Sequence, residues 1–207
     1  MIIINNKYLF FIITIITLVF SCSTKKELFV DYSSSKIEYF GRIDSSKVKG
    51  VELYWSGSSV KINFEGESLS VLMEDENGDN YYNIIIDNDS LFIVHLDTSK
   101  RYYQLVSGLP KGKHTVEIFK RTEWDRGKTS FYGIRIKGNA KLLPRSVPYE
   151  RKMEFYGNSI TAGYAVEDTS GSDSPDSTFT NNYLSYAALQ PDTLMQNTNA
   201  SVEVVLV

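Results

Sequence analysis

The chain has 207 residues, a formal net charge of −3 and an isoelectric point of about 5.5. A mildly acidic chain without a basic cluster lacks the electrostatic footprint of a nucleic-acid-binding protein, so we expect no such partner. One cysteine and two histidines exclude an intrachain disulfide and argue against a histidine–cysteine zinc site. The sequence therefore predicts neither a metal site nor a cofactor.

The N-terminal segment predicts export. Residues 9–20 are almost wholly apolar, with Lys7 before them. This run is shorter than the about 20 residues that span a bilayer, and it matches the hydrophobic region of a secretory signal peptide. Val19-Phe20-Ser21-Cys22 resembles the lipobox of bacterial lipoproteins. We therefore expect residues 1–21 to be a signal peptide and Cys22 to carry lipid, which anchors an exported protein to a periplasmic or cell-surface membrane. A free thiol at Cys22 in an uncleaved anchor is the alternative.

Beyond a predicted solvated tether, residues 22–35, the pattern from 36 to 143 is that of short strands. Apolar and polar residues alternate across 60–64 and 69–73, as in strands with one buried face. Further strand candidates are residues 84–86, 91–96, 116–118 and 134–136. Turn signals lie between them at Ser56-Gly57-Ser58, Asn77-Gly78, Asp87-Asn88-Asp89 and Pro110-Lys111-Gly112. This spacing predicts a β-sandwich domain over residues 36–143.

The pattern changes after Pro144 and Pro148, which mark a linker over residues 144–150. Residues 151–207 read as the beginning of an α/β unit: a strand, a serine turn, a polar loop over 168–180, a helix over 183–189 and a last strand over 201–207. These few helices and strands cannot bury a parallel sheet on both faces. We therefore expect this α/β domain to be incomplete.

A serine follows the first strand of that unit. Met153 and Phe155 alternate with polar neighbours, Gly157 permits a tight turn, and Ser159 follows at the start of the predicted helix. A hydroxyl placed there lies near helix N–H groups that help an oxyanion form. Asn and Ser are also the preferred residues for an ordinary helix N-cap. The two interpretations of Ser159, nucleophile and cap, are equally favoured by these residues alone.

Several stretches resemble carbohydrate esterase family 2, whose esterase domain is of the SGNH (GDSL) type. Gly157-Asn158-Ser159-Ile160-Thr161 is similar to the first SGNH block, with Asn158 where that block usually has Asp. Residues 182–189 resemble the first helix of the catalytic domain. Three upstream stretches, residues 39–42, 113–123 and 131–134, resemble the β-sandwich that precedes it.

The resemblance implies a jelly-roll-like N-terminal sandwich followed by an incomplete SGNH hydrolase domain, C-terminally truncated. It implies a serine esterase that removes O-acetyl groups from plant polysaccharide, xylan or mannan, with Ser159 as nucleophile. The backbone N–H groups of Gly157 and Ser159 would contribute to the oxyanion site. No counterpart of the late histidine base of SGNH esterases is found, so we expect the chain as written to be inactive. A non-enzymatic carbohydrate-binding surface lipoprotein is the alternative.

The remaining candidates favour structural roles. His95 and His114 lie in the β-rich part, away from the serine, and the acidic clusters at residues 74–76 and 87–89 are typical of hairpin turns. Both tryptophans have the faces to stack on a sugar ring. We expect Trp55, after an apolar strand, to be buried and Trp124, in a polar loop, to be exposed.

Overall fold

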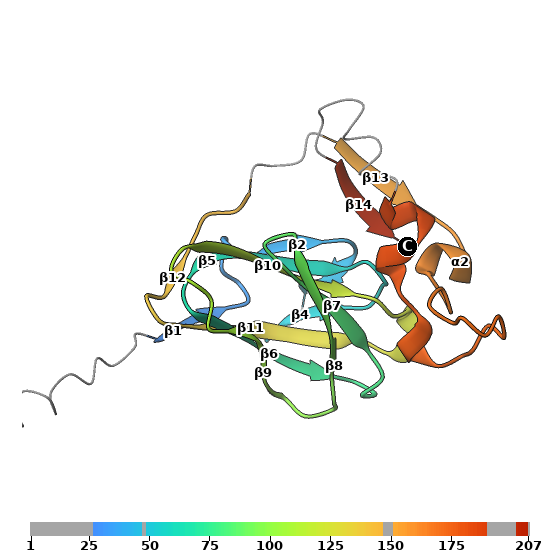
Figure 1. Cartoon of the computed structure of the whole chain (residues 1–207), viewed down its shortest axis with the longest axis horizontal. Helices are drawn as coiled ribbons and strands as arrows, with labels where there is room; N and C mark the ends of the chain where they lie inside the picture. Colours follow the sequence, from blue (N-terminus) through green and yellow to red (C-terminus); the bar gives the residue numbers. More distant parts are fainter. Residues whose placement is uncertain (1–26, 47–48, 147–150, 190–201, 207) are drawn as a thin grey trace, which may run out of the picture.

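The computed structural model describes residues 27–46, 49–146, 151–189 and 202–206, of which 151–152 and 202–206 only as backbone. Cys22, the predicted signal peptide and part of the predicted tether lie outside the described residues. Among the described residues, no helix is long and apolar enough to cross a membrane. Figure 1 shows a β-rich body with helical turns and two further strands at one end.

Two six-stranded antiparallel sheets form a sandwich, as the alternating pattern predicts. The first has the order β3-β4-β11-β6-β9, with β1 paired to β11. Its strands are β3 (Ile43–Asp44), β4 (Val51–Leu53), β11 (Thr129–Lys137), β6 (Ser68–Asp75), β9 (Arg101–Ser107) and β1 (Glu27–Asp31). The second has the order β12-β5-β10-β7-β8, with β2 paired to β5. Its strands are β12 (Lys141–Leu142), β5 (Ser59–Glu65), β10 (Lys113–Lys120), β7 (Tyr81–Ile86), β8 (Ser90–His95) and β2 (Glu38–Phe40).

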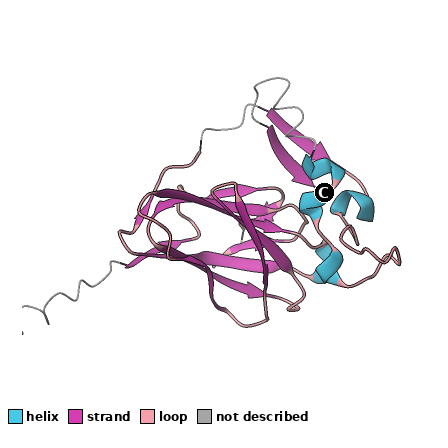
Figure 2. Ribbon diagram, viewed as in Figure 1, coloured by secondary structure: helices cyan, strands magenta, loops and turns pink. Residues whose placement is uncertain are grey.

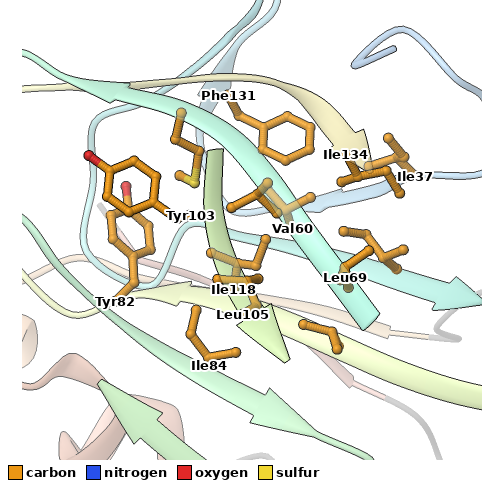
Figure 3. Close-up of a cluster of buried hydrophobic side chains, with 14 of the residues drawn as sticks. Ile37, Val60, Leu69, Tyr82, Ile84, Tyr103, Leu105, Ile118, Phe131 and Ile134 are labelled. Atoms are coloured by element: carbon orange, nitrogen blue, oxygen red, sulfur yellow. The ribbon is translucent and has the colours of Figure 1, made fainter. Parts of the chain in front are cut away.

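The core lies between the two sheets, where the inward-facing member of each alternating pair is buried. Val60, Ile62 and Phe64 of β5 are fully buried, and Leu69 and Val71 of β6 meet them from the other sheet. Figure 3 shows side chains from both sheets gathered in this layer. Removal of such side chains from water is the main favourable contribution to folding, at roughly 25 cal/mol per Å² of apolar surface.

One part of the predicted tether belongs to the sandwich. Residues 27–31 form β1, which pairs antiparallel with β11 from Glu27↔Lys137 to Asp31↔Gly133. Leu28 and Val30 pack against the core, while Phe29 faces outward and is 59% exposed. The prediction of a solvated tether across these residues was wrong. Phe29 is apolar although it faces outward, so residues 28–30 do not show the alternation of apolar and polar residues that marks a strand.

The described residues after 150, which are 151–189 and 202–206, lie at one end of the sandwich (Figure 2). β13 (Arg151–Phe155) pairs in parallel with β14 (Val202–Leu206), which confirms the last predicted strand. Between them lie α2 (Ser159–Ala162) and the 3₁₀ turns η2 (Ser177–Phe179) and η3 (Asn182–Leu184). An α/β hydrolase domain is not evident in the part of the chain that the structure describes.

The helix predicted over residues 183–189 is shorter than expected. Residues 182–184 form η3, and helix geometry begins only at Tyr186. The Asn181 side chain accepts a hydrogen bond from the Tyr183 N–H, and the Asn182 N–H donates to the Arg121 carbonyl of the sandwich. These two bonds hold residues 182–184 in a 3₁₀ turn against the sandwich, so the regular helix begins later than predicted.

Candidate active site

The serine turn connects β13 to α2. Asn158 is the N-cap of α2, and its side-chain oxygen accepts a hydrogen bond from the Ile160 N–H at 3.1 Å. The cap position is therefore filled by the residue before Ser159. Ser159 is exposed at the first position of the helix, and within the described residues no hydrogen bond engages its hydroxyl.

Two glycines allow this turn to close. A Cβ at Gly157 would overlap the hydroxyl oxygen of Thr161, which itself lies 2.9 Å from the Tyr186 hydroxyl. Gly163 has a φ of +77° as the C-cap of α2, and a Cβ there would lie 2.5 Å from the Asn181 carbonyl oxygen. The Asn181 N–H donates in return to the Gly163 carbonyl at 3.0 Å. The backbone on both sides of Ser159 thus approaches its neighbours too closely for a side chain.

The serine turn faces two loops of the sandwich across a cavity of about 200 Å³. The sandwich contributes Trp55, Ser56, Glu123 and Trp124, and the turn contributes Gly157, Asn158, Ser159, Thr161 and Ala162. The expectation of an exposed Trp124 is confirmed, because this side chain is 62% exposed. Trp55 is only half-buried, which corrects the expectation that it lies in the core. Tyr54, next to it, lies beyond the end of β4, where the chain has already left the sheet.

Glu123 is the one carboxyl group in the described lining of this cavity. Burial, together with repulsion from Asp125, raises the pKa of Glu123 above its usual value. The lining therefore combines two tryptophans with a carboxyl group and Ser159.

Arg121 joins the sandwich to residues 151–189, which we call the serine segment. It follows β10 directly, its side chain is only 1% exposed, and its guanidinium pairs with Glu167. The same guanidinium donates to the carbonyl oxygens of Thr178 and Thr180 at 3.1 and 3.2 Å. Because Arg presents several donors in a fixed fork, one side chain can fix three acceptors of the segment at once.

Further polar contacts surround this buried arginine. The Asn83 amide donates to the Asn181 side chain at 3.0 Å, and the Arg126 guanidinium donates to the Pro175 carbonyl at 2.8 Å. Phe119 and Tyr183 meet edge to face, with ring centroids 5.3 Å apart. The serine segment is therefore attached to the end of the sandwich by directional bonds, of which the one between Asn83 and Asn181 is buried.

Lys120 holds together the two loops that carry the tryptophans. Its ammonium group is fully buried and donates to the carbonyl oxygens of Tyr54, Thr122 and Glu123 at 2.9, 3.1 and 3.1 Å. Burial lowers the pKa of Lys120 to about 7. Since Tyr54 precedes Trp55 and Glu123 precedes Trp124, these three bonds fix the sandwich wall of the cavity.

Both histidines of the chain have partners elsewhere. His114 Nδ1 lies 2.8 Å from an Asp87 carboxylate oxygen, and Nε2 lies 2.9 Å from the Pro110 carbonyl oxygen. Burial lowers its pKa, but these two acceptors outweigh that effect and raise the pKa above the ordinary value. His114 lies at the start of β10, about 20 Å along the strand from Arg121.

His95 stacks on Tyr81 with centroids 4.3 Å apart, and its Nε2 lies 2.9 Å from the Gly78 carbonyl oxygen. Neither histidine lines the cavity at Ser159. The structural roles expected of both residues fit these contacts.

The acidic clusters organise turns, as the sequence predicts. Asp75 is buried and accepts hydrogen bonds from Gly78, Asn80 and Thr129. Asp87 and Asn88 have positive φ angles of 53° and 58° in the hairpin between β7 and β8. No group of three or more His, Cys, Asp or Glu residues suited to a metal ion occurs within the described ranges.

Lys120 and Arg121 were not identified as site residues from the sequence. The sequence does contain one sign that a charged side chain is buried here. Two consecutive charged residues end an alternating strand, in which one of any two neighbours should face the core. Two of the partners of Lys120 are near it in the chain, but Tyr54 lies 66 positions from Lys120 and Glu167 lies 46 positions from Arg121. A local pattern cannot predict these distant contacts.

The sequence matches the family described as carbohydrate esterase 2 N-terminal over residues 39–145. The cellulase/esterase CelE of Acetivibrio thermocellus is 38% identical over 175 residues, which cover 84% of this chain and 21% of that protein. An acetylxylan esterase / glucomannan deacetylase of Cellvibrio japonicus is 28% identical over 141 residues, which cover 68% of this chain and 39% of the relative.

Solved structures agree with these matches. A family two carbohydrate esterase from Cellvibrio japonicus superposes with a TM-score of 0.79 at 25% identity, over 89% of this chain and 52% of the other. A family two carbohydrate esterase from Clostridium thermocellum in complex with cellohexaose gives a TM-score of 0.74 at 37% identity, over 83% and 50%. This chain therefore belongs to carbohydrate esterase family 2. It spans about half the length of these solved chains and less than half of the curated relatives that it matches.

Proposed function

We propose that this protein is a serine esterase that removes O-acetyl groups from plant polysaccharide such as xylan or mannan, with Ser159 as its nucleophile. In this proposal, residues 151–207 form the opening part of an SGNH-type α/β hydrolase domain. The observation that carries the proposal is the exposed Ser159 at a tight strand-to-helix turn, facing a cavity whose other wall comes from the family's sandwich. The names of the Cellvibrio japonicus relatives support the choice of substrate.

In the proposed reaction, the Ser159 oxygen attacks the acetyl carbonyl carbon while a base takes the hydroxyl proton. The carbonyl oxygen becomes an oxyanion, for which the N–H groups of Gly157 and Ser159 supply two donors. Collapse of the intermediate expels the sugar alkoxide, which takes a proton and leaves as the free hydroxyl. Water then attacks the acetyl-enzyme, releases acetate and returns the proton to Ser159.

The base is the missing component. Both histidines of the 207 residues are engaged by other groups. We infer that the histidine base, and further oxyanion donors, come from sequence outside these 207 residues.

We also propose that the protein is an exported lipoprotein anchored through Cys22. The prediction is that Cys22→Ser prevents lipid attachment, so that the variant loses its membrane association while it is still exported or accumulates as precursor. Metabolic labelling with a fatty-acid analogue, followed by membrane fractionation, measures this. Equal labelling and equal fractionation of the variant and the parent would contradict a lipid on Cys22.

A non-enzymatic carbohydrate-binding function is the second candidate. Two tryptophans line the cavity, and no imidazole does so within the described residues. A protein that only binds polysaccharide would need these aromatic faces and would not need the Ser159 hydroxyl.

A chimera separates the two candidates. Residues 1–189 of this chain are joined to the part of CelE that follows its equivalent of residue 189, and acetate release from acetylated xylan and acetylated mannan is measured. We expect release that Ser159→Ala abolishes and that Ser172→Ala, a change at an exposed serine of the neighbouring loop, leaves intact. A folded chimera that is inactive, or equally active with Ser159→Ala, would favour the binding function.

A further inference from the structure

We propose that Trp55 and Trp124 form a stacking subsite through which the sandwich holds a pyranose ring beside Ser159. The two indoles have centroids 6.4 Å apart and an interplanar angle of 44°, and both line the cavity that Ser159 faces. This proposal specifies how the proposed esterase would bind its substrate. It rests on the proposed function in one respect only, that the bound ring carries the acetyl ester.

The exposure of Trp124 is the first support. A 62% exposed tryptophan leaves a large apolar face in water, although large aromatic side chains gain most from burial. Its neighbours in the sequence, Glu123 and Asp125, are acidic, and Trp124 begins the turn η1 (Trp124–Arg126). A ligand with a flat, weakly polar face would cover it.

The rigidity of both loops is the second support. Lys120 bonds to the Tyr54, Thr122 and Glu123 carbonyls in front of the two indoles. Behind Trp124, the Asn80 amide donates to the carbonyl oxygens of Arg126 and Gly127 at 3.2 and 3.1 Å. The backbone that carries both indoles is therefore held in place, and binding to a preformed surface reduces the entropy cost of ordering it.

The chemistry of the cavity selects the ligand class. The C–H-rich face of a pyranose ring is weakly positive and complements the negative face of an indole. Ring hydroxyl groups need acceptors and donors nearby, and Glu123, Ser56 and Asn158 line the same cavity. The cavity of about 200 Å³ is smaller than a drug-sized site of roughly 300 to 1,000 Å³, which suits a single sugar residue with its chain leaving on the open side.

The test is calorimetric titration of the 207-residue chain in detergent with xylohexaose, mannohexaose and cellohexaose. We expect at least one of the three to bind, with affinity reduced about tenfold or more by Trp124→Ala and by Trp55→Ala, and largely restored by Trp124→Phe. Phe29→Ala is the matched control, because Phe29 is also a 59% exposed aromatic residue but lies on β1. Trp124→Ala is expected to remain folded because its side chain is mostly exposed, and circular dichroism verifies this.

Absence of binding by all three oligosaccharides, or equal affinities of the parent and the Trp124→Ala variant, would overturn the subsite. Failure of the esterase proposal gives a different result: Trp124-dependent binding persists, and the chimera releases no acetate. An active chimera in which Trp124→Ala changes neither KM nor kcat would contradict the subsite but not the esterase function.

Discussion

At the residue scale, the site depends on two consecutive buried basic residues, Lys120 at the end of β10 and Arg121 directly after it. Lys120 fixes the two tryptophan loops, and Arg121 fixes the serine segment. A buried charge is tolerated only when its partners compensate the lost hydration, and removal of one member leaves the others unpaired. The two neighbouring side chains therefore hold the two opposite walls of one cavity.

Arg121→Ala should detach the serine segment while the sandwich stays folded. The change leaves Glu167 and the Thr178 and Thr180 carbonyls without their common donor, which we expect to destabilise the docked segment by about 3 kcal/mol. The measurement is hydrogen exchange at the Asn182 amide, which donates to the Arg121 carbonyl. Arg101→Ala, which removes an exposed pair with Asp97, is the control and should not change that rate. Unchanged protection in Arg121→Ala would show that other contacts dock the segment.

Lys120 should make stability depend on pH above neutrality. The pKa of this amine is about 7 in the folded chain, against 10.5 for an ordinary lysine. Between these values the unfolded chain binds more protons than the folded one, so the contribution of Lys120 to the unfolding free energy rises with pH. Below pH about 7 both states are protonated and this dependence ends.

Lys120→Met should remove that rise, on the order of 1 kcal/mol per pH unit between pH 7 and 9, and also loosen both tryptophan loops. Urea unfolding across this pH range measures it. Lys128→Met is the control, because the hydrogen bond that Lys128 donates to the Glu52 carboxylate raises the pKa of Lys128 and keeps it charged throughout. Parallel stability curves for the parent and Lys120→Met would contradict the lowered pKa.

At the element scale, the sequence predicts the strands well and the serine segment only in part. Alternation across residues 60–64 and 69–73 places β5 and β6 correctly, because one face of each strand must enter the core. The alternation does not reveal β1, because Phe29 is apolar although it lies on the outer face of the sheet. The helix expected to begin at Tyr183 starts at Tyr186, because bonds to Asn181 and Arg121 override the local preference.

Gly163→Ala should weaken the turn that follows Ser159. Alanine would have to adopt a left-handed φ and would also overlap the Asn181 carbonyl, so we expect a loss of about 2 kcal/mol or more. Gly171→Ala is the matched control: its φ of +72° imposes the same backbone strain, and a Cβ there meets nothing within 4 Å. Thermal unfolding and exchange of the Asn181 amide measure the difference. Equal losses for the two variants would mean that the contact with Asn181 does not constrain the turn.

At the scale of the whole molecule, the serine and its cavity are divided between the sandwich and the segment after it. Both histidines are held by other groups, so neither can serve as the base for Ser159. We therefore expect the 207-residue chain alone to release acetate no faster than its Ser159→Ala variant. Release from acetylated xylan at an esterase-like rate, lost on Ser159→Ala, would show that the chain contains its own base.

The most direct test of the central claim is to locate the acetyl group during turnover. The chimera with CelE is mixed with an activated acetyl ester, quenched in acid within the first turnovers, digested and mapped by mass spectrometry. We expect one added acetyl group on the peptide that contains Ser159, and none in the Ser159→Ala variant. An acetyl group found on another residue, or turnover that continues in Ser159→Ala, would contradict the assignment of Ser159 as nucleophile.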